Sequence, residues 1–109
     1  MSRRTIQRLR DIAAACAAIA RHIERSDADD EIVFDAVRAR LIEIGEAVKD
    51  LERPLTASEP DIPWTDIARM RDHLAHRYFD TTHAIVTATA RHDIPRLEAA
   101  ISRMLDELD

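Results

Sequence analysis

The sequence predicts an all-α protein, an antiparallel bundle of about five helices, two of them long and three shorter. Helix breakers are scarce among its 109 residues, because glycine occurs once and proline four times. Apolar residues recur at spacings of three and four, which is the pattern of a helix with one buried face. Apolar residues make up 46% of the chain and charged residues 34%, so the chain can bury a core and is not expected to be disordered. This length suits a single domain over residues 1–109.

The two long helices are predicted over roughly residues 3–25 and 29–52. The first has an apolar stripe at helical spacing, formed by Ile6, Leu9, Ala13, Cys16, Ala20 and Ile23. Residues 26–30 end it and supply N-cap and acidic residues for the second helix. The second stripe is formed by Phe34, Val37, Leu41, Ile44, Val48 and Leu51. Two such stripes bury each other most simply in an antiparallel hairpin.

Residues 53–63 are predicted to be a loop, because they contain three of the four prolines among Ser, Thr and acidic residues. The loop stops the second helix, since the residue before a proline is disfavoured in the helical conformation. Asp61 and Pro63 can then begin a third helix, which we expect to run to about Tyr78. Its inward-facing residues are expected to be Ile67, Met70, Leu74 and Tyr78.

Two shorter helices are predicted in the last third of the chain. Residues 80–82 can cap a fourth helix over about 82–91. Asp93 and Pro95 can begin the last helix, because both residue types are favoured at helix starts. The apolar stripe of that last helix is formed by Ile94, Leu97, Ile101, Met104 and Leu108.

The single glycine, Gly45, lies inside the second predicted helix. Glycine in a helix interior costs about 1 kcal/mol relative to alanine. A glycine at such a place indicates the close approach of another backbone or of a ligand. Of these two interpretations, tight packing between helices is the one we favour.

Charge and composition restrict the classes of function. The formal net charge of −5 argues against binding nucleic acid through a broad basic surface. The charge is uneven, because four arginines lie within the first ten residues: Arg3, Arg4, Arg8 and Arg10. The single cysteine, Cys16, cannot form a disulfide within the chain and is expected in the core. No apolar run is long enough to span a membrane and no secretory signal is recognisable, so we expect a cytoplasmic protein without a membrane partner.

The segment most informative about function is residues 71–78, Arg-Asp-His-Leu-Ala-His-Arg-Tyr. Arg71 supplies a fixed cation suited to phosphate oxygens, and His76 titrates near neutral pH and can move protons. On a straight helix, five positions correspond to about 140° of rotation, so Arg71 and His76 do not share a face. Either the helix ends or bends near Ala75, or a second copy of the chain completes the site.

Two further residues of this segment are expected to have supporting roles. Asp72 is four positions before His76 and could accept a hydrogen bond from it, and an ion pair with Arg69 or Arg77 is the alternative. His73 and His76 form an H-x-x-H pair of the kind that can bind a metal. Metal sites in bundles usually add a Glu-x-x-His unit, which this sequence lacks, so we expect neither a metal nor another cofactor.

The octet reads R-x4-H-x-Y with a polar residue after the arginine. It resembles the motif of HEPN-superfamily ribonucleases, in the form carried by HepT-type toxins of bacterial toxin–antitoxin pairs. The similarity extends to residues 44–47 (Ile-Gly-Glu-Ala), 62–72 and 92–97, and so covers about residues 5–108. One departure is Thr87, where the family often has an aromatic residue.

The resemblance implies a HEPN-type bundle and a metal-independent endoribonuclease with Arg71 and His76 as catalytic residues. It also implies a homodimer, or a higher oligomer of dimers, that brings two copies of the motif to one cleft. The implied partner is a nucleotidyltransferase antitoxin of the MNT type, as in type VII toxin–antitoxin systems. In the family, the tyrosine matching Tyr78 is the acceptor of AMP, giving O-AMP-tyrosine.

Two other classes of function stay open at this point. A HEPN bundle can also be a non-catalytic interaction module that scaffolds a nucleotidyltransferase partner. A metal-dependent four-helix enzyme is the third class. A pure scaffold has no need to keep both Arg71 and His76, which favours the ribonuclease.

Overall fold

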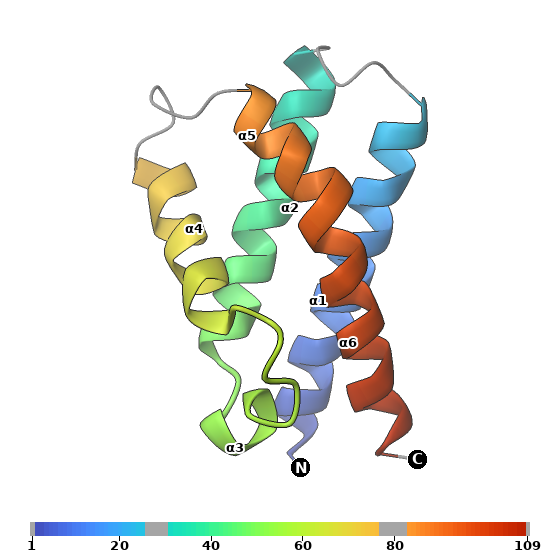
Figure 1. The fold of residues 1–109 in the computed structure, drawn as a ribbon, viewed down its shortest axis with the longest axis vertical. Helices are drawn as coiled ribbons and strands as arrows, with labels where there is room; N and C mark the ends of the chain where they lie inside the picture. Colours follow the sequence, from blue (N-terminus) through green and yellow to red (C-terminus); the bar gives the residue numbers. More distant parts are fainter. Residues whose placement is uncertain (1, 26–30, 77–82, 109) are drawn as a thin grey trace.

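The computed structural model describes residues 2–25, 31–76 and 83–108, and these residues form helices and no strand (Figure 1). The all-α prediction is confirmed, and both long helices are where the periodicity placed them. The elements in chain order are α1 (Arg3–Arg25), α2 (Glu31–Lys49), the single-turn α3 (Arg53–Thr56), α4 (Trp64–His76), α5 (His83–Ala88), the π-helical segment η2 (Thr89–Asp93) and α6 (Ile94–Asp106).

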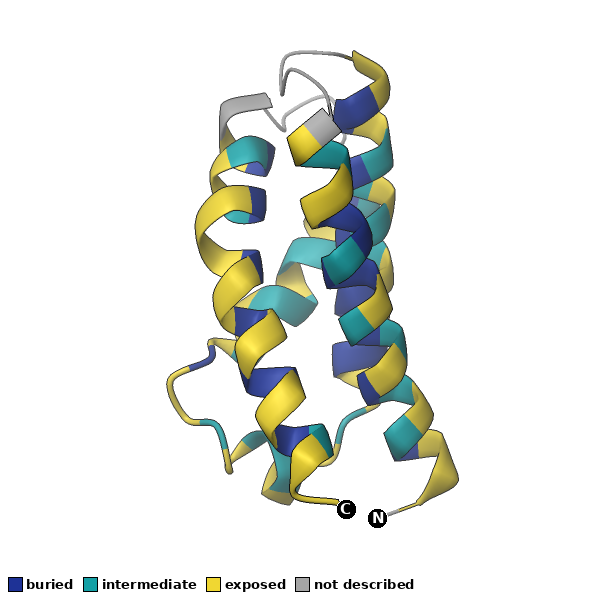
Figure 2. Cartoon of the chain, turned by 90° about the vertical axis from the view of Figure 1, so that its right-hand side faces the viewer, coloured by how far each residue is buried: buried dark blue, intermediate teal, exposed yellow. Residues whose placement is uncertain are grey.

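The core lies where α1 packs against α2 and α6, and α2 in turn packs against α4 (Figure 1). Along the longer helices, buried residues face the interior of the bundle and exposed residues cover the outside (Figure 2). The predicted stripes of α2 and α6 are confirmed, except that Leu51 is half-buried and Leu108 is 37% exposed. Cys16 is buried, as expected.

The predicted stripe of α1 is partly wrong. Ala20 is exposed, whereas Ile12, Ala15 and Ile19, which lie outside the predicted stripe, are almost completely buried. The cause is that α1 is covered by two helices, α2 and α6, so it buries a wider sector than a single stripe.

The two short helices predicted after residue 82 are one continuous helical rod in which α5 passes through η2 into α6. The N–H of Ile94 bonds to the carbonyl oxygen of Thr89, five residues back, as in a π-helix. Pro95 accounts for this wider turn, because a proline in a helix lacks a donor and its ring clashes with the carbonyl four residues earlier. The chain therefore accommodates the proline without ending the helix.

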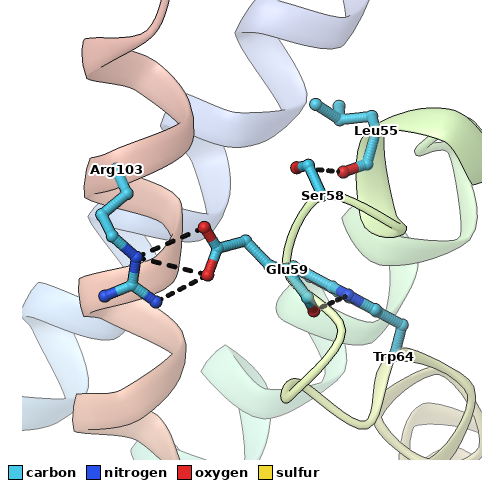
Figure 3. A network of polar contacts seen from close by, with 5 residues as sticks. All are labelled: Leu55, Ser58, Glu59, Trp64 and Arg103. Carbon is cyan, nitrogen blue, oxygen red and sulfur yellow. Dashed lines mark hydrogen bonds and ion pairs between the residues drawn. The ribbon is translucent and has the colours of Figure 1, made fainter.

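The segment between α2 and α4, predicted as a loop, contains α3 and is tied to α6 (Figure 3). The Nη2 atom of Arg103 on α6 lies 2.6 Å from Oε1 of Glu59. The Trp64 Nε1–H donates to the carbonyl oxygen of Glu59 at 3.1 Å. These contacts fix the point at which α4 begins, one residue after Pro63.

Helix α4 borders a cleft of about 250 Å³ that also involves the η2–α6 rod. The apolar residues lining it are Ile62, Ile67, Met70, Ile94 and Leu97. Within the described segments, no helix combines the length and the apolar character needed to cross a bilayer.

Candidate functional site

Helix α4 carries the motif that the sequence singled out. Arg71, Asp72 and His73 lie in its second half, and His76 is its last residue, described here by its backbone alone. Because α4 is continuous from Arg71 to His76, their positions lie about 140° apart around its axis. Tyr78 lies outside the described residues. The structure therefore gives side-chain contacts for Arg71 and Asp72, whereas for His76 it gives only the position on the helix.

Helices α2 and α4 approach each other closely at Gly45. A Cβ atom at this position would overlap the Cβ of Arg71 and lie 3.1 Å from its Cγ and 3.2 Å from the carbonyl oxygen of Ile67. Tight helix packing, the favoured interpretation of this glycine, is confirmed. The side chain that packs against Gly45 is that of Arg71, so this contact also positions a residue of the motif.

Two carboxylates hold the guanidinium of Arg71. Its Nε forms an ion pair with Oε1 of Glu46 on α2. Its Nη1 donates to Oδ1 of Asp72 at 3.1 Å. The Arg71 side chain is 27% exposed, so it is partly covered yet reachable from solvent. Since one carboxylate comes from α2 and the other from α4, the guanidinium is fixed across the contact between these helices.

Asp72 bridges two cations. The same oxygen, Oδ1, accepts from Nζ of Lys49 at 2.7 Å and from Nη1 of Arg71 at 3.1 Å. The hydrogen bonds from Lys49 and then from Arg71 hold the pKa of Asp72 below its usual range, so this carboxylate is ionised at neutral pH. The described partners of Asp72 are therefore Lys49 and Arg71, neither of which was among those considered from the sequence.

The carboxyl end of α4 is held by Arg38 of α2. Its Nη2 donates to the carbonyl oxygen of Leu74 at 2.8 Å. The guanidinium is a charged donor, and hydrogen bonds from charged donors are stronger than those from neutral ones. This contact fixes α4 two residues before His76.

Three residues at this site were not predicted from the sequence: Arg38, Glu46 and Lys49. All three lie on α2, more than twenty positions before their partners, so no spacing rule connects them to the motif. Two signals were available: Gly45 marked a place on α2 where another element comes close, and the family-like segment 44–47 contains Glu46. His73 is exposed. Among the residues whose side chains are described, no group of three or more His, Cys, Asp or Glu gathers in a way that could hold a metal ion.

Chemically, the described atoms form a cluster of two cations, Arg71 and Lys49, and two carboxylates, Glu46 and Asp72. An arginine fixed at two nitrogens and a lysine reach the same oxygen atom, and oxygen anions such as phosphate are what these groups bind. The cleft between α4 and α6 is a separate feature, because none of the described motif residues lines it.

The chain is similar in sequence to known proteins. A family model described as "Ribonuclease HepT-like" matches residues 4–104. The chain is 37% identical over 76 residues to a protein of Thermococcus cleftensis named "Probable ribonuclease HepT", an alignment covering 70% of this chain and 68% of that protein. It is 36% identical over 78 residues to a Caldanaerobacter subterraneus protein whose name assigns it provisionally as an RNase, covering 72% of this chain and 70% of that protein. No solved structure matches the chain at comparable significance.

Proposed function

Because the chain belongs to the HepT-like ribonuclease family, we propose that it is a metal-independent endoribonuclease toxin that acts through its R-x4-H motif in the cytoplasm. Arg71 and His76 are its catalytic residues, with Asp72 and His73 in supporting roles. The observation that carries this proposal is the seating of Arg71, which is packed on Gly45 and held by carboxylates at a site within reach of solvent.

The reaction we propose is an attack by the RNA 2′-hydroxyl on the adjacent phosphorus. The 2′-oxygen forms a bond to phosphorus, the bond to the 5′-oxygen breaks, and the products are a 2′,3′-cyclic phosphate and a 5′-hydroxyl. One proton leaves the 2′-hydroxyl and one is delivered to the 5′-oxygen, both through His76 as base or acid. Arg71 binds the non-bridging oxygens, where negative charge develops in the transition state.

We further propose that the active form is a homodimer, or a higher oligomer of dimers. Positions 71 and 76 lie on different sides of one continuous helix. A symmetric dimer that joins two copies of α4 in one cleft supplies the guanidinium from one protomer and the imidazole from its partner. It also supplies two histidines, one for each proton transfer.

Cleavage of single-stranded RNA in the presence of EDTA tests the proposed reaction. We expect His76→Ala to reduce the cleavage rate by about 10²–10⁴-fold, the range typical of losing a general acid–base. His92→Ala, which removes an exposed histidine of η2, is the matched control and should cleave like the wild type. If His76→Ala cleaves as fast as the His92→Ala control, the assignment of His76 is wrong.

The partner we propose is a nucleotidyltransferase antitoxin of the MNT type, which transfers AMP from ATP to the phenol oxygen of Tyr78. The added phosphodiester would lie a few residues from Arg71 and compete with RNA for its guanidinium. Intact-mass measurement after coexpression with such an enzyme should detect AMP-sized additions on the wild type and none on Tyr78→Phe. Additions that persist in Tyr78→Phe would rule out this acceptor.

One observation favours the alternative, a non-catalytic module that scaffolds its partner. Arg71 is paired with carboxylates, as a purely structural arginine would be. Growth of cells expressing the protein separates the two functions, because a scaffold arrests growth neither as wild type nor as His76→Ala. Arrest by the wild type that disappears in His76→Ala supports the ribonuclease.

A further inference from the structure

The carboxylate of Asp72 occupies a position that an incoming phosphate could take. A single oxygen, Oδ1, lies 2.7 Å from Nζ of Lys49 and 3.1 Å from Nη1 of Arg71. The two cations come from different helices, Lys49 from the end of α2 and Arg71 from α4. The Asp72 side chain is 53% exposed and that of Lys49 38%, so the bridge lies at the surface.

We propose that Lys49 is a second phosphate-binding residue of this site, and that Asp72 takes the place of a phosphodiester oxygen of single-stranded nucleic acid until substrate displaces it. This inference rests on the proposed ribonuclease function and deepens it, because it names the residues that bind the strand. Arg71 and Lys49 then hold one phosphate between them.

The exchange conserves the contacts of both cations. A phosphodiester, like a carboxylate, is an anionic oxygen acceptor, so Lys49 and Arg71 trade one charged partner for another. Exposed ion pairs contribute little to stability, and Asp72 can turn into solvent and remain hydrated. Displacing this carboxylate therefore disturbs neither helix, and Glu46 continues to hold Nε of Arg71.

Lys49 differs from the other cations of the chain in a way that suits this role. It is the only lysine, so it contributes a flexible point charge beside the rigid fork of Arg71. The chain carries a formal net charge of −5, and its affinity for nucleic acid therefore depends on local clusters of cations. Lys49 and Arg71 bring two cations together at the motif, and displacement of Asp72 leaves Arg71 paired with Glu46.

Binding of a fluorescein-labelled 12-mer of deoxythymidine, followed by anisotropy between 20 and 200 mM salt, tests the proposal. This probe lacks the 2′-hydroxyl and cannot be cleaved by the proposed reaction, so the assay reports binding alone. We expect Lys49→Gln to flatten the plot of log affinity against log salt by about 0.7, the contribution of one phosphate contact on a single strand. Lys49→Arg should keep the wild-type slope.

The Asp72→Asn variant should raise the affinity for the 12-mer, because it removes the carboxylate that competes with phosphate. We expect it to bind the 12-mer several-fold more tightly, and to lose most of this gain when combined with Lys49→Gln. The controls are Arg21→Gln on α1 and Asp106→Asn at the end of α6, which make the same charge changes at exposed positions elsewhere on the bundle. Circular dichroism shows whether each variant is folded.

A direct readout does not depend on substitution. Reductive methylation with ¹³C-formaldehyde labels the single lysine and the terminal amine and preserves their charge. The Lys49 methyl signal should shift on addition of the 12-mer. An unshifted signal, a Lys49→Gln slope equal to that of Arg21→Gln, or a wild type that does not bind the 12-mer would each overturn the role of Lys49.

The failure of this inference and the failure of the proposed function give different results. If RNA is cleaved in a His76-dependent manner while Lys49→Gln keeps the wild-type slope, the ribonuclease stands and the Lys49 contact does not. If RNA is not cleaved while Lys49→Gln loses one phosphate contact, the binding site stands and the ribonuclease does not.

Discussion

Substitution of Gly45 by alanine tests whether the α2–α4 contact sets the position of Arg71. The new methyl group would overlap the Cβ of Arg71 and lie 3.1 Å from its Cγ and 3.2 Å from the carbonyl oxygen of Ile67. Non-bonded carbon atoms prefer about 3.5–4.0 Å. The Cβ of Arg71 and the carbonyl of Ile67 are fixed to the backbone of α4, so no change of rotamer removes the overlap. Helix α4 has to move away from α2.

Two effects of opposite sign determine the change in stability. Alanine is favoured over glycine in a helix interior by about 1 kcal/mol. Overpacking of a close contact costs about 1–3 kcal/mol. We expect the upper part of this range here, because the Cβ of Arg71 is fixed to the backbone and cannot move away by a change of rotamer. We therefore expect Gly45→Ala to lower the free energy of unfolding by about 1–2 kcal/mol. For a domain of this size that corresponds to a fall of about 4–8 °C in Tm.

Guanidinium chloride unfolding followed by circular dichroism measures this loss, and a double-mutant cycle assigns it to the contact. Arg71→Gly removes the Cβ that the new methyl group meets, so Gly45→Ala should be less harmful in the Arg71→Gly background. We expect a coupling energy of about 0.5–3 kcal/mol between the two positions. If Gly45→Ala is as stable as the wild type and the coupling is zero, the packing explanation of this glycine is wrong.

Three further predictions concern the rest of the bundle. Burial and then the charge of Glu98 raise the pKa of the Cys16 thiol to about 12. At pH 8 the native protein should therefore react with iodoacetamide only as fast as it unfolds. A reaction rate like that of a free thiol would contradict this. The hydrogen bond from Arg103 holds the pKa of Glu59 below 4.5, so its stabilising effect is complete above about pH 4.5 and is lost as the pH falls through the folded-state pKa. Glu59→Gln should therefore show a shallower fall in Tm below pH 4.5 than the wild type, and parallel curves would refute this. Trp64→Phe removes the hydrogen bond to the carbonyl of Glu59 and should lower the free energy of unfolding in urea by about 1 kcal/mol, whereas an unchanged midpoint would show that this bond does not contribute.

The helices were predictable because their apolar residues repeat with the helical period. For α2 and α6 that pattern also identified the buried face. It failed for α1, where Ala20 was expected inside and is exposed. Alanine is small enough to be tolerated on either side of a helix, so a sequence rich in alanine does not say how many neighbours cover it. That depends on α6, which is about seventy residues further along the chain.

The breaks between helices were harder to predict than the helices. Pro95 indicated the start of a new helix, whereas the helix continues through this region by way of a π-helical turn. Prolines in residues 53–63 indicated a loop, yet Pro54 lies in the first turn of α3, where its missing N–H is not needed. In both cases the residue type limits the local hydrogen bonds, and the surrounding packing decides whether the helix ends.

The site shows the same division between local and tertiary information. Arg71 was found because it belongs to a short motif on one helix. Glu46 and Lys49 were not, because they meet Arg71 and Asp72 only after α2 and α4 have packed. Gly45, Glu46 and Lys49 occupy one turn of α2 and the start of the next, and all three contact residues of the motif.

The effect of Gly45 on RNA cleavage can be measured separately from its effect on stability. A bundle that needed only a stable α2–α4 contact could use alanine at position 45 with slightly wider helix spacing and gain helix propensity. The glycine instead allows the backbone of α4 to lie close enough for Glu46 to reach Nε of Arg71. A stabilising substitution at a distant exposed site, added to Gly45→Ala, should therefore restore Tm without restoring RNA cleavage. If cleavage returns together with Tm, the glycine serves packing alone and the position of Arg71 tolerates the displacement.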